Sequence, residues 1–258
     1  MNLEDIRAYW EARAEGDDSP QATTQDVFLR AIEQGVLAER IRSRAPRSVA
    51  DVGCGDGRTT IGLARRFPDI RFFGLDYATA MIDRARKVAC TEGVSNASFC
   101  RQDLRDGLGD SFDLAYSTRC LINLPSWDLQ MDAVAKIHAA LAPGGSYLMI
   151  ENFVEGHDNF NRIRHDFGLP EIPIRKHNLY FARDRLLHYA RTLFDVVEEL
   201  NISSTYYLVS RVVYSRICAD AGAEPDYFDA HHRYAASLPF CGEYGPVRLI
   251  AFQKKRER

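Results

Sequence analysis

The stretch Ser48-Val49-Ala50-Asp51-Val52-Gly53-Cys54-Gly55-Asp56-Gly57 places three glycines at every second position, directly after a run of small and β-branched residues. Residues 58–67, which follow, have the pattern of a helix. Glycine is needed where the backbone adopts a positive φ or approaches a ligand closely. The first N–H groups of a helix are free to bind a polar ligand. The stretch therefore predicts a strand, a glycine loop that can bind a ligand, and a helix.

The glycine spacing indicates which ligand the loop binds. The dinucleotide fingerprint G-x-G-x-x-G binds a pyrophosphate at the helix start, whereas glycines at 53, 55 and 57 after Asp51 give D-x-G-x-G-x-G. With this pattern the chain resembles the class I S-adenosylmethionine (SAM)-dependent methyltransferases, in which such a loop holds the amino-acid portion of SAM. The resemblance places Asp51, Gly53 and Gly55 in the cofactor site. An ordinary tight turn between a strand and a helix is the alternative.

The composition excludes several other classes. The chain has 258 residues, of which 46% are hydrophobic and 27% charged, and a formal net charge of −3. This balance is typical of a soluble globular protein and gives no overall attraction to nucleic acid or anionic membranes. The acidic, polar start of the chain is unlike a signal peptide. The six cysteines are scattered, with no C-x-x-C pair, so we expect a cytoplasmic protein without a metal site.

The order of segments predicts an α/β fold. Alternating strands and helices favour right-handed crossovers and a parallel sheet with helices on both faces. Two further strands match the antiparallel pair that closes the seven-stranded, doubly wound sheet of the family. We expect strands at 48–52, 70–75, 97–101, 112–116, 146–150, 194–202 and 246–252, and core helices at 58–67, 79–92 and 126–141.

We expect one methyltransferase domain over residues 1–258. Residues 1–45 would form an N-terminal helical cap with helices at 3–15 and 25–42, joined by a polar stretch at 16–24. Residues 46–152 would form the cofactor-binding core. Residues 153–258 would contribute the closing strands and two insertions over the site, at 155–192 and 203–243. The short basic tail is expected to be a solvated terminus.

In an open parallel sheet, ligands bind beyond the carboxyl ends of the strands, and polar residues follow several strands of this chain. Asp76 ends the second strand, nineteen residues after Gly57. An acid at this place can accept hydrogen bonds from ribose hydroxyls, although a helix N-cap explains it too. The resemblance also gives Asp103 an adenine-binding role, against a turn-forming Asp as the alternative. It extends the cofactor site to Tyr77, Met81, Leu104 and Ser117, and to Tyr9 and Arg13 of the cap.

Candidate residues for the acceptor lie in the loop after the fourth strand and in the insertions. We expect His177, Glu151 and Arg119 to take part in catalysis, with His177 as the first choice for a general base. The alternatives are a structural role for His177 and a solvent-exposed side chain for Arg119. The expected acceptor-binding residues are Asn123, Asn152, Tyr180, Tyr206 and Arg211.

These observations predict methyl transfer from SAM to an oxygen, or next a nitrogen, of a small polar metabolite. No nucleic-acid or membrane partner is expected. The alternatives are a protein or tRNA methyltransferase, a SAM-binding protein without catalysis, and a nicotinamide-dependent oxidoreductase. The segment Ser117–Pro125 lacks the Asp/Asn-Pro-Pro-Tyr/Phe pattern of enzymes that methylate nucleic-acid bases, which counts against a base as the acceptor.

Overall fold

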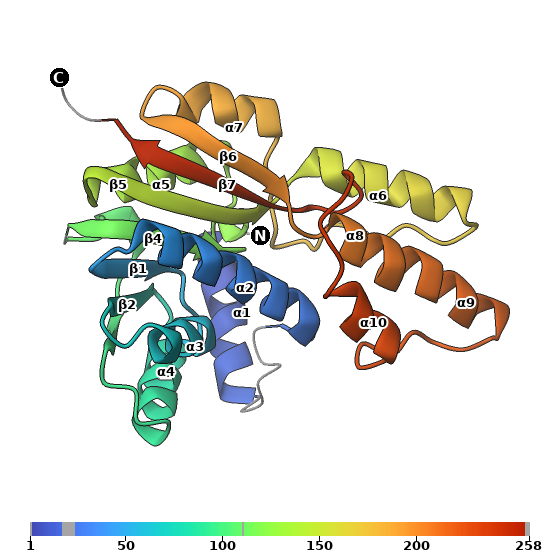
Figure 1. Ribbon diagram of the computed structural model, residues 1–258, viewed down its shortest axis with the longest axis horizontal. Coiled ribbons are helices and arrows are strands. Elements are labelled where there is room, and N and C mark those ends of the chain that lie inside the picture. The colour runs from blue at the N-terminus through green and yellow to red at the C-terminus, as the bar shows by residue number, and fades with distance from the viewer. Residues whose placement is uncertain (1, 17–23, 110, 256–258) are drawn as a thin grey trace.

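The computed structural model describes residues 2–16, 24–109 and 111–255 (Figure 1). The predicted polar stretch at 16–24 and the basic tail therefore lie largely outside the described residues. The described strands are β1 (Ser48–Val52), β2 (Arg71–Asp76), β3 (Ala97–Arg101), β4 (Phe112–Thr118), β5 (Leu141–Asn152), β6 (Phe194–Asn201) and β7 (Val247–Lys254).

The strands form one sheet in the order β3-β2-β1-β4-β5-β7-β6. Strands β1 to β5 are parallel, and β7 is antiparallel to both β5 and β6. The predicted doubly wound, seven-stranded sheet is confirmed. Several strand boundaries differ from the predicted ones by one or two residues, and the largest difference is that β5 begins at Leu141, with a register shift against β4 between Phe112 and Leu114. The Pro143-Gly144-Gly145 turn thus lies inside the strand rather than before it.

Helices cover both faces of the sheet. They are α1 (Leu3–Gly16), α2 (Val27–Arg44), α3 (Arg58–Arg66), α4 (Thr79–Thr91), α5 (Trp127–Ala139), α6 (Val154–Asp166), α7 (Arg183–Ala190), α8 (Ser204–Tyr207), α9 (Tyr214–Asp220) and α10 (Ala230–Ala235), with short 3-10 turns η1 (Leu104–Asp106) and η2 (Leu121–Asn123) and the π-helical turn η3 (Leu208–Val213). Within the described ranges, none of these helices is long and apolar enough to cross a lipid bilayer.

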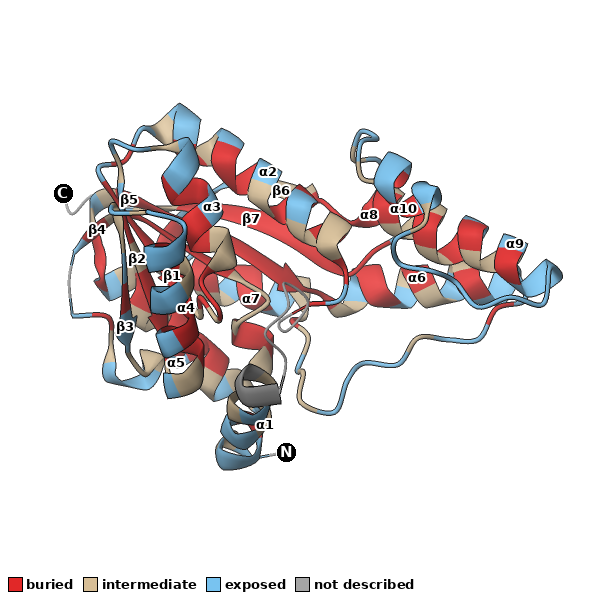
Figure 2. Ribbon diagram, turned by 90° about the horizontal axis from the view of Figure 1, so that it is seen from below, coloured by how far each residue is buried: buried red, intermediate tan, exposed pale blue. Residues whose placement is uncertain are grey.

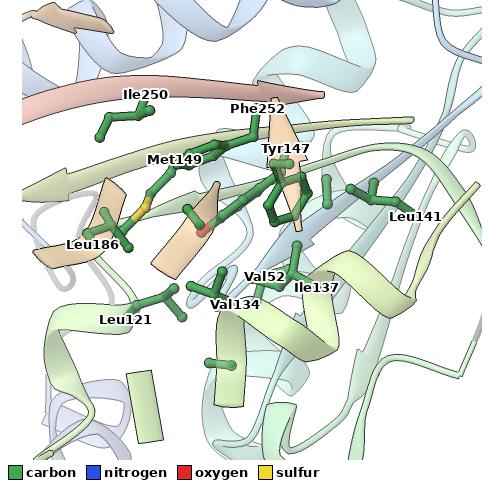
Figure 3. Close-up of a cluster of buried hydrophobic side chains, with 14 of the residues drawn as sticks. Val52, Leu121, Val134, Ile137, Leu141, Tyr147, Met149, Leu186, Ile250 and Phe252 are labelled. Carbon is green, nitrogen blue, oxygen red and sulfur yellow. The ribbon is translucent and has the colours of Figure 1, made fainter. Parts of the chain in front are cut away.

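The core has one apolar layer on each side of the sheet. On one side, residues of α5 and α7 such as Val134, Ile137 and Leu186 pack against Tyr147 and neighbouring strand residues (Figure 3). On the other side, the apolar stripes of α2 and α3 pack on β1, β4, β5 and β7. The inner strands β1, β4, β5 and β7 are buried along most of their length, whereas the edge strands β3 and β6 are mostly half-buried or exposed (Figure 2). Burial on both faces explains why the strands are continuous apolar runs.

The N-terminal helix α1 packs against the start of α4. The N-cap position of α4 is Ala78, which offers no side-chain acceptor. The carboxylate of Glu11 accepts the backbone N–H groups of Thr79 and Ala80 instead, at 3.0 and 3.1 Å. Trp10 packs against Ala78 and Met81. Because a carboxylate is favourable at a helix N-terminus, Glu11 both caps α4 and holds α1 beside the carboxyl edge of the sheet.

The two insertions lie together beyond the carboxyl edge of the sheet, where α6, α8, α9 and α10 gather (Figure 1). The first contains α6, a long irregular segment and α7. The second contains α8, η3 and α9, which follow one another without a gap, and then α10. Turns of π-helix occur frequently at functional sites.

Candidate active site

A cavity of about 550 Å³ opens at the carboxyl ends of β1, β2, β4 and β5, between α1, the first turns of α2 and both insertions. Fourteen predicted site residues line it: Tyr9, Arg13, Asp51, Gly53, Gly55, Asp76, Tyr77, Met81, Arg119, Asn123, Asn152, His177, Tyr180 and Arg211. A second hollow of about 410 Å³ lies at the amino ends of the strands, around Asp113 and Gly145. It is at the wrong edge of the sheet for a ligand of this fold.

The glycine loop forms one wall of the cavity. Gly53, Gly55 and Gly57 have φ of 74°, 52° and 72°, a region that glycine adopts without strain. The loop is fixed by the N–H of Gly53, which donates to the carbonyl oxygen of Leu75 at 2.8 Å. A Cβ atom at Gly53 would lie 2.1 Å from Sγ of Cys120. The loop therefore requires glycine for its backbone and for the approach of the segment after β4.

Asp51 lines the cavity, but its carboxylate mainly stabilises the loop. Its Oδ2 accepts the hydroxyls of Thr60, at 2.6 Å, and Tyr116, at 2.7 Å. Burial raises the pKa of Asp51 to about 7 despite these bonds. Asp51 thus joins β1, α3 and β4 below the glycines.

Asp76 has the acceptor capacity that a ligand with hydroxyl groups requires. Its Oδ2 accepts the N–H of Gly55 and its Oδ1 that of Ala78, both at 2.9 Å. Each carboxylate oxygen can accept a further hydrogen bond. Burial raises the pKa of Asp76. Beside it, the buried hydroxyl of Tyr77 has no hydrogen-bond partner among the described residues. The glycine wall, Asp76 and Tyr77 therefore fit a polar nucleoside such as the one in SAM.

Three predicted cofactor residues do not line the cavity. Asp103 is 29% exposed and its carboxylate is held by the guanidinium of Arg105 at 2.6 Å, which lowers its pKa. Leu104 packs against the core beside α5. Ser117 is fully buried, and its hydroxyl contacts the carboxylate of Glu151 and the hydroxyl of Tyr147, each at 2.8 Å. The structure gives Ser117 and Leu104 packing roles instead of the expected contact with a cofactor.

Glu151 holds the loop after β4 and does not face the cavity. It is fully buried. Its Oε1 accepts the hydroxyl of Ser117 and the N–H groups of Cys120, at 3.1 Å, and Leu121, at 3.0 Å. Its Oε2 accepts the N–H of Ile122 at 3.4 Å. Burial outweighs these bonds and raises the pKa of Glu151 to about 7. The carboxylate of Glu151 therefore does not reach the cavity, as the expected catalytic role requires, and instead positions the loop after β4.

The loop that Glu151 holds presents Arg119 and Asn123 to the cavity. Arg119 adopts a φ of 49°, a strained value for a residue with a Cβ atom, and its guanidinium pairs with Glu33 of α2 at 2.8 Å. The amide nitrogen of Asn123 donates to the carbonyl oxygens of Arg119 and Cys120, at 3.0 and 3.2 Å. This arrangement fixes the amide orientation, and Oδ1 of Asn123 is buried without a partner in the described part of the chain.

In the first insertion, His177 and Tyr180 reach the cavity. The ring of His177 stacks on Tyr9 with centroids 4.6 Å apart and meets the edge of Trp10 at 6.1 Å. Burial, and then the charge of Arg175, lower the pKa of His177, so the imidazole is neutral at physiological pH. A neutral imidazole can accept a proton, but this ring also connects the insertion to α1.

In the second insertion, Arg211 reaches the cavity from η3. It donates to the carboxylate of Asp26 and, at 2.8 Å, to the hydroxyl of Tyr227. The rings of Tyr207 and Tyr227 each lie 4.8 Å from its guanidinium carbon. Tyr206, expected in the acceptor site, does not line the cavity. Its hydroxyl donates to Asp26 at 2.6 Å and so supports Arg211 indirectly.

Several residues that line the cavity were not expected from the sequence. They are Asp26, which is the N-cap of α2, Arg30 and Glu33 of α2 itself, and Arg175 and Tyr227 of the insertions. Positions 26, 30 and 33 share one face of a helix, and charges recurring at this spacing beside the apolar stripe were the available signal. Arg175 and Tyr227 carry no comparable pattern.

The chain is similar to known methyltransferases in sequence and in fold. A family model described as a methyltransferase domain matches residues 49–145. A trans-aconitate 2-methyltransferase of Rhodococcus jostii is 31% identical over 147 residues, 54% of each chain. A malonyl-[acyl-carrier protein] O-methyltransferase of Paenibacillus is 24% identical over 173 residues, 64% of this chain and 62% of that protein. The match thus spans little more than half the length of these relatives.

A solved structure shares the fold over nearly the whole chain. The N-methyltransferase NodS of Bradyrhizobium japonicum, in complex with S-adenosyl-L-homocysteine (SAH), superposes with a TM-score of 0.60 at 16% identity, covering 96% of this chain and 98% of that one. Residues 49–145 are thus similar to a methyltransferase domain, and the chain as a whole has the Rossmann-like fold of a solved methyltransferase.

Proposed function

We propose that the protein binds SAM and transfers its methyl group to an oxygen of a small polar metabolite, with nitrogen as the second choice of acceptor atom. The observation that carries the proposal is that one cavity has two differently lined parts, which we call the cofactor half and the acceptor half. Gly53, Gly55, Asp76 and Tyr77 line one half, and arginine, asparagine and tyrosine side chains line the other. A donor and an acceptor bound in one cavity can be aligned for direct transfer.

The residues of the cofactor half suit each part of SAM. The glycine loop leaves room for the amino-acid portion, and Asp76 can accept hydrogen bonds from the ribose hydroxyls. Tyr77 and Met81 would pack on the nucleoside, while Tyr9 and Arg13 of α1 would cover it. Asp103 would reach the adenine only if its pairing with Arg105 leaves an oxygen accessible. When bound, SAM supplies a methyl group already activated by the sulfonium, so the protein mainly has to align the acceptor.

The acceptor half determines what is methylated. Asn123, Asn152, Tyr180 and Arg211 offer polar contacts to a small molecule. His177 is the candidate base for a hydroxyl or protonated amine. Two relatives are named for trans-aconitate and for the malonyl group of an acyl carrier protein, and the second name specifies an O-methyltransferase. These names favour oxygen.

Calorimetry with SAH and with NAD tests the cofactor assignment. We expect SAH to bind and NAD to bind weakly or not at all. Tighter binding of NAD would favour an oxidoreductase and contradict the proposal. Transfer of labelled methyl from SAM to a panel of metabolites then tests the activity. SAH binding without turnover on any metabolite, protein or tRNA would leave the non-catalytic SAM-binding protein as the better reading.

The cysteines and the net charge bear on where the protein acts and on its partners. All six cysteines are free thiols, which supports a reducing cytoplasm as the location. The formal net charge of −3 argues against tRNA as the acceptor, because nucleic-acid binding depends on a basic surface. A methyl-transfer assay with total tRNA would show whether this alternative holds.

A further inference from the structure

Three arginines from separate segments approach one phenol in the acceptor half of the cavity. Arg119 follows β4, Arg175 lies between α6 and α7, and Arg211 belongs to η3, and all three line the cavity together with Tyr180. The charge of each lowers the pKa of Tyr180 against the larger effect of burial. The three arginines and Tyr180 thus line one cavity from three separate segments of the chain.

Two of these three arginines are paired with acids of α2 and its N-cap. Glu33 pairs with Arg119 at 2.8 Å, and Asp26 pairs with Arg211. Arg175 is exposed at the rim and has no ion pair among the described residues. The histidine of this half, His177, has its pKa lowered and adds no positive charge at neutral pH. Arg175 is thus a cation of the cavity rim to which an anionic ligand can bind.

Arg211 is held in place and still has a free donor. Asp26 and Tyr227 occupy its two terminal nitrogens, and the rings of Tyr207 and Tyr227 cover its faces. Its Nε–H group is buried with no partner in the described part of the chain. An unpaired buried donor costs free energy, which an accepting ligand would recover. A planar carboxylate accepts such an N–H in a short, charge-assisted bond.

No carboxylate of the acceptor half is free to act as a general base, within the described residues, because Asp26 and Glu33 are both committed to arginines. An acceptor that is already an anion needs no base. For such an acceptor, His177 would position α1 through its stack on Tyr9.

We propose that the acceptor is an organic acid with at least two carboxylates, one bound by Arg211 and Arg175 and the other methylated. This inference rests on the proposed function and adds the substrate class. In the reaction, a carboxylate oxygen forms a bond to the methyl carbon while the bond from that carbon to sulfur breaks. The electron pair of the broken bond goes to sulfur. The products are a methyl ester and SAH, and no proton is transferred.

Calorimetry on the SAH-bound protein tests this class of acceptor. The probes are malonate, succinate, citrate and trans-aconitate, each paired with its fully esterified, uncharged counterpart. We expect at least one acid to bind roughly tenfold or more tightly than its ester, because the ester cannot form charge-assisted bonds. We also expect its affinity to fall as salt is added.

Two variants and a control locate the binding. We expect Arg211→Lys to weaken binding of that acid by roughly tenfold, because lysine lacks the Nε–H and the planar fork. Arg175→Gln, at an exposed position, should weaken it roughly threefold. Arg162→Gln, on the exposed side of α6 and away from the cavity, is the matched control and should leave it unchanged. SAH affinity should be the same in all three, which also shows that each variant is folded.

Two results would overturn the inference. One is that every acid fails to bind or binds no better than its ester. The other is that both arginine variants bind the acid as the parent protein does. Either result leaves the proposed function standing as long as SAH binds, whereas loss of SAH binding by the parent protein would contradict the proposed function itself.

Discussion

The imidazole ring of His177 stacks on the phenol ring of Tyr9, with centroids 4.6 Å apart and ring planes inclined by 29°. The two residues are far apart in the sequence and come from α1 and from the first insertion. Glu11 holds the same helix against the start of α4. The helix α1 is therefore attached to α4 through Glu11 and to the first insertion through the stack of Tyr9 on His177.

This contact predicts how substitutions at His177 differ. His177→Phe keeps an aromatic ring on Tyr9 and should retain most of the turnover. His177→Ala removes the stack, worth about 0.5–1.5 kcal/mol, and should lower turnover by roughly two- to tenfold. Steady-state kinetics on both variants makes the comparison. If His177→Phe is as inactive as His177→Ala, the imidazole acts as the base and the positioning role is wrong.

A second prediction concerns Asp76. Asp76→Ala should weaken SAH binding by about 1–3 kcal/mol, because a pair of ligand hydroxyls would lose its acceptor. Asp83→Ala, on the exposed side of α4, is the matched control and should bind SAH normally. Calorimetry measures both. An unchanged affinity in Asp76→Ala would remove the ribose role from this residue.

Glu151 predicts a dependence of stability on pH. Burial raises its pKa from an ordinary 4.5 to about 7 in the folded protein. The folded chain therefore holds this proton more tightly than the unfolded chain does. The associated stability is complete below pH 4.5 and is lost as pH rises towards 7. The change should be on the order of 3 kcal/mol.

Glu151→Gln should flatten this part of the profile, since the amide cannot titrate and its oxygen can still accept the three donors that meet Oε1. Urea unfolding between pH 4 and pH 8 (about the range in which these groups titrate) measures the difference. Glu224→Gln, at an exposed position, is the control. Asp51 adds a change of the same sign in both proteins. Parallel profiles for the parent and Glu151→Gln would show that Glu151 does not titrate as described.

The glycine loop can be tested by separating strain from steric conflict. Gly53 and Gly93 both have positive φ, 74° and 65°. A Cβ atom at Gly93 would meet nothing within 4 Å, whereas one at Gly53 would collide with Cys120. Gly93→Ala should therefore destabilise the fold only through the strain of a positive φ in alanine, by roughly 1–2 kcal/mol. Gly53→Ala should lose more and should also weaken SAH binding. Equal effects in the two variants would argue against a tightly packed loop.

The sequence predicted the sheet well because strand signals are local. Short apolar runs, each followed by a polar residue, placed β1, β2, β4 and β5 and their shared edge. Asp76 and Gly53 were found for the same reason, since a parallel sheet brings the ends of these strands together.

The acceptor half was harder to predict because tertiary packing determines it. Glu151 follows β5 like a site residue, yet its carboxylate turns inward to the N–H groups of the next loop. Tyr206 and Tyr207 are adjacent, but the helical turn sends only Tyr207 to the cavity. Arg175 lies in an irregular segment whose path depends on contacts with α1. No periodic pattern in the sequence predicts these side-chain positions.

A crystal structure of the protein with SAH bound tests the central claim most directly. The account predicts SAH beside Gly53 and Gly55, with the ribose hydroxyls donating to the carboxylate of Asp76 and the sulfur directed towards Asn123 and Arg211. SAH bound at any other edge of the sheet, or in this cavity without contact to Asp76, would contradict it.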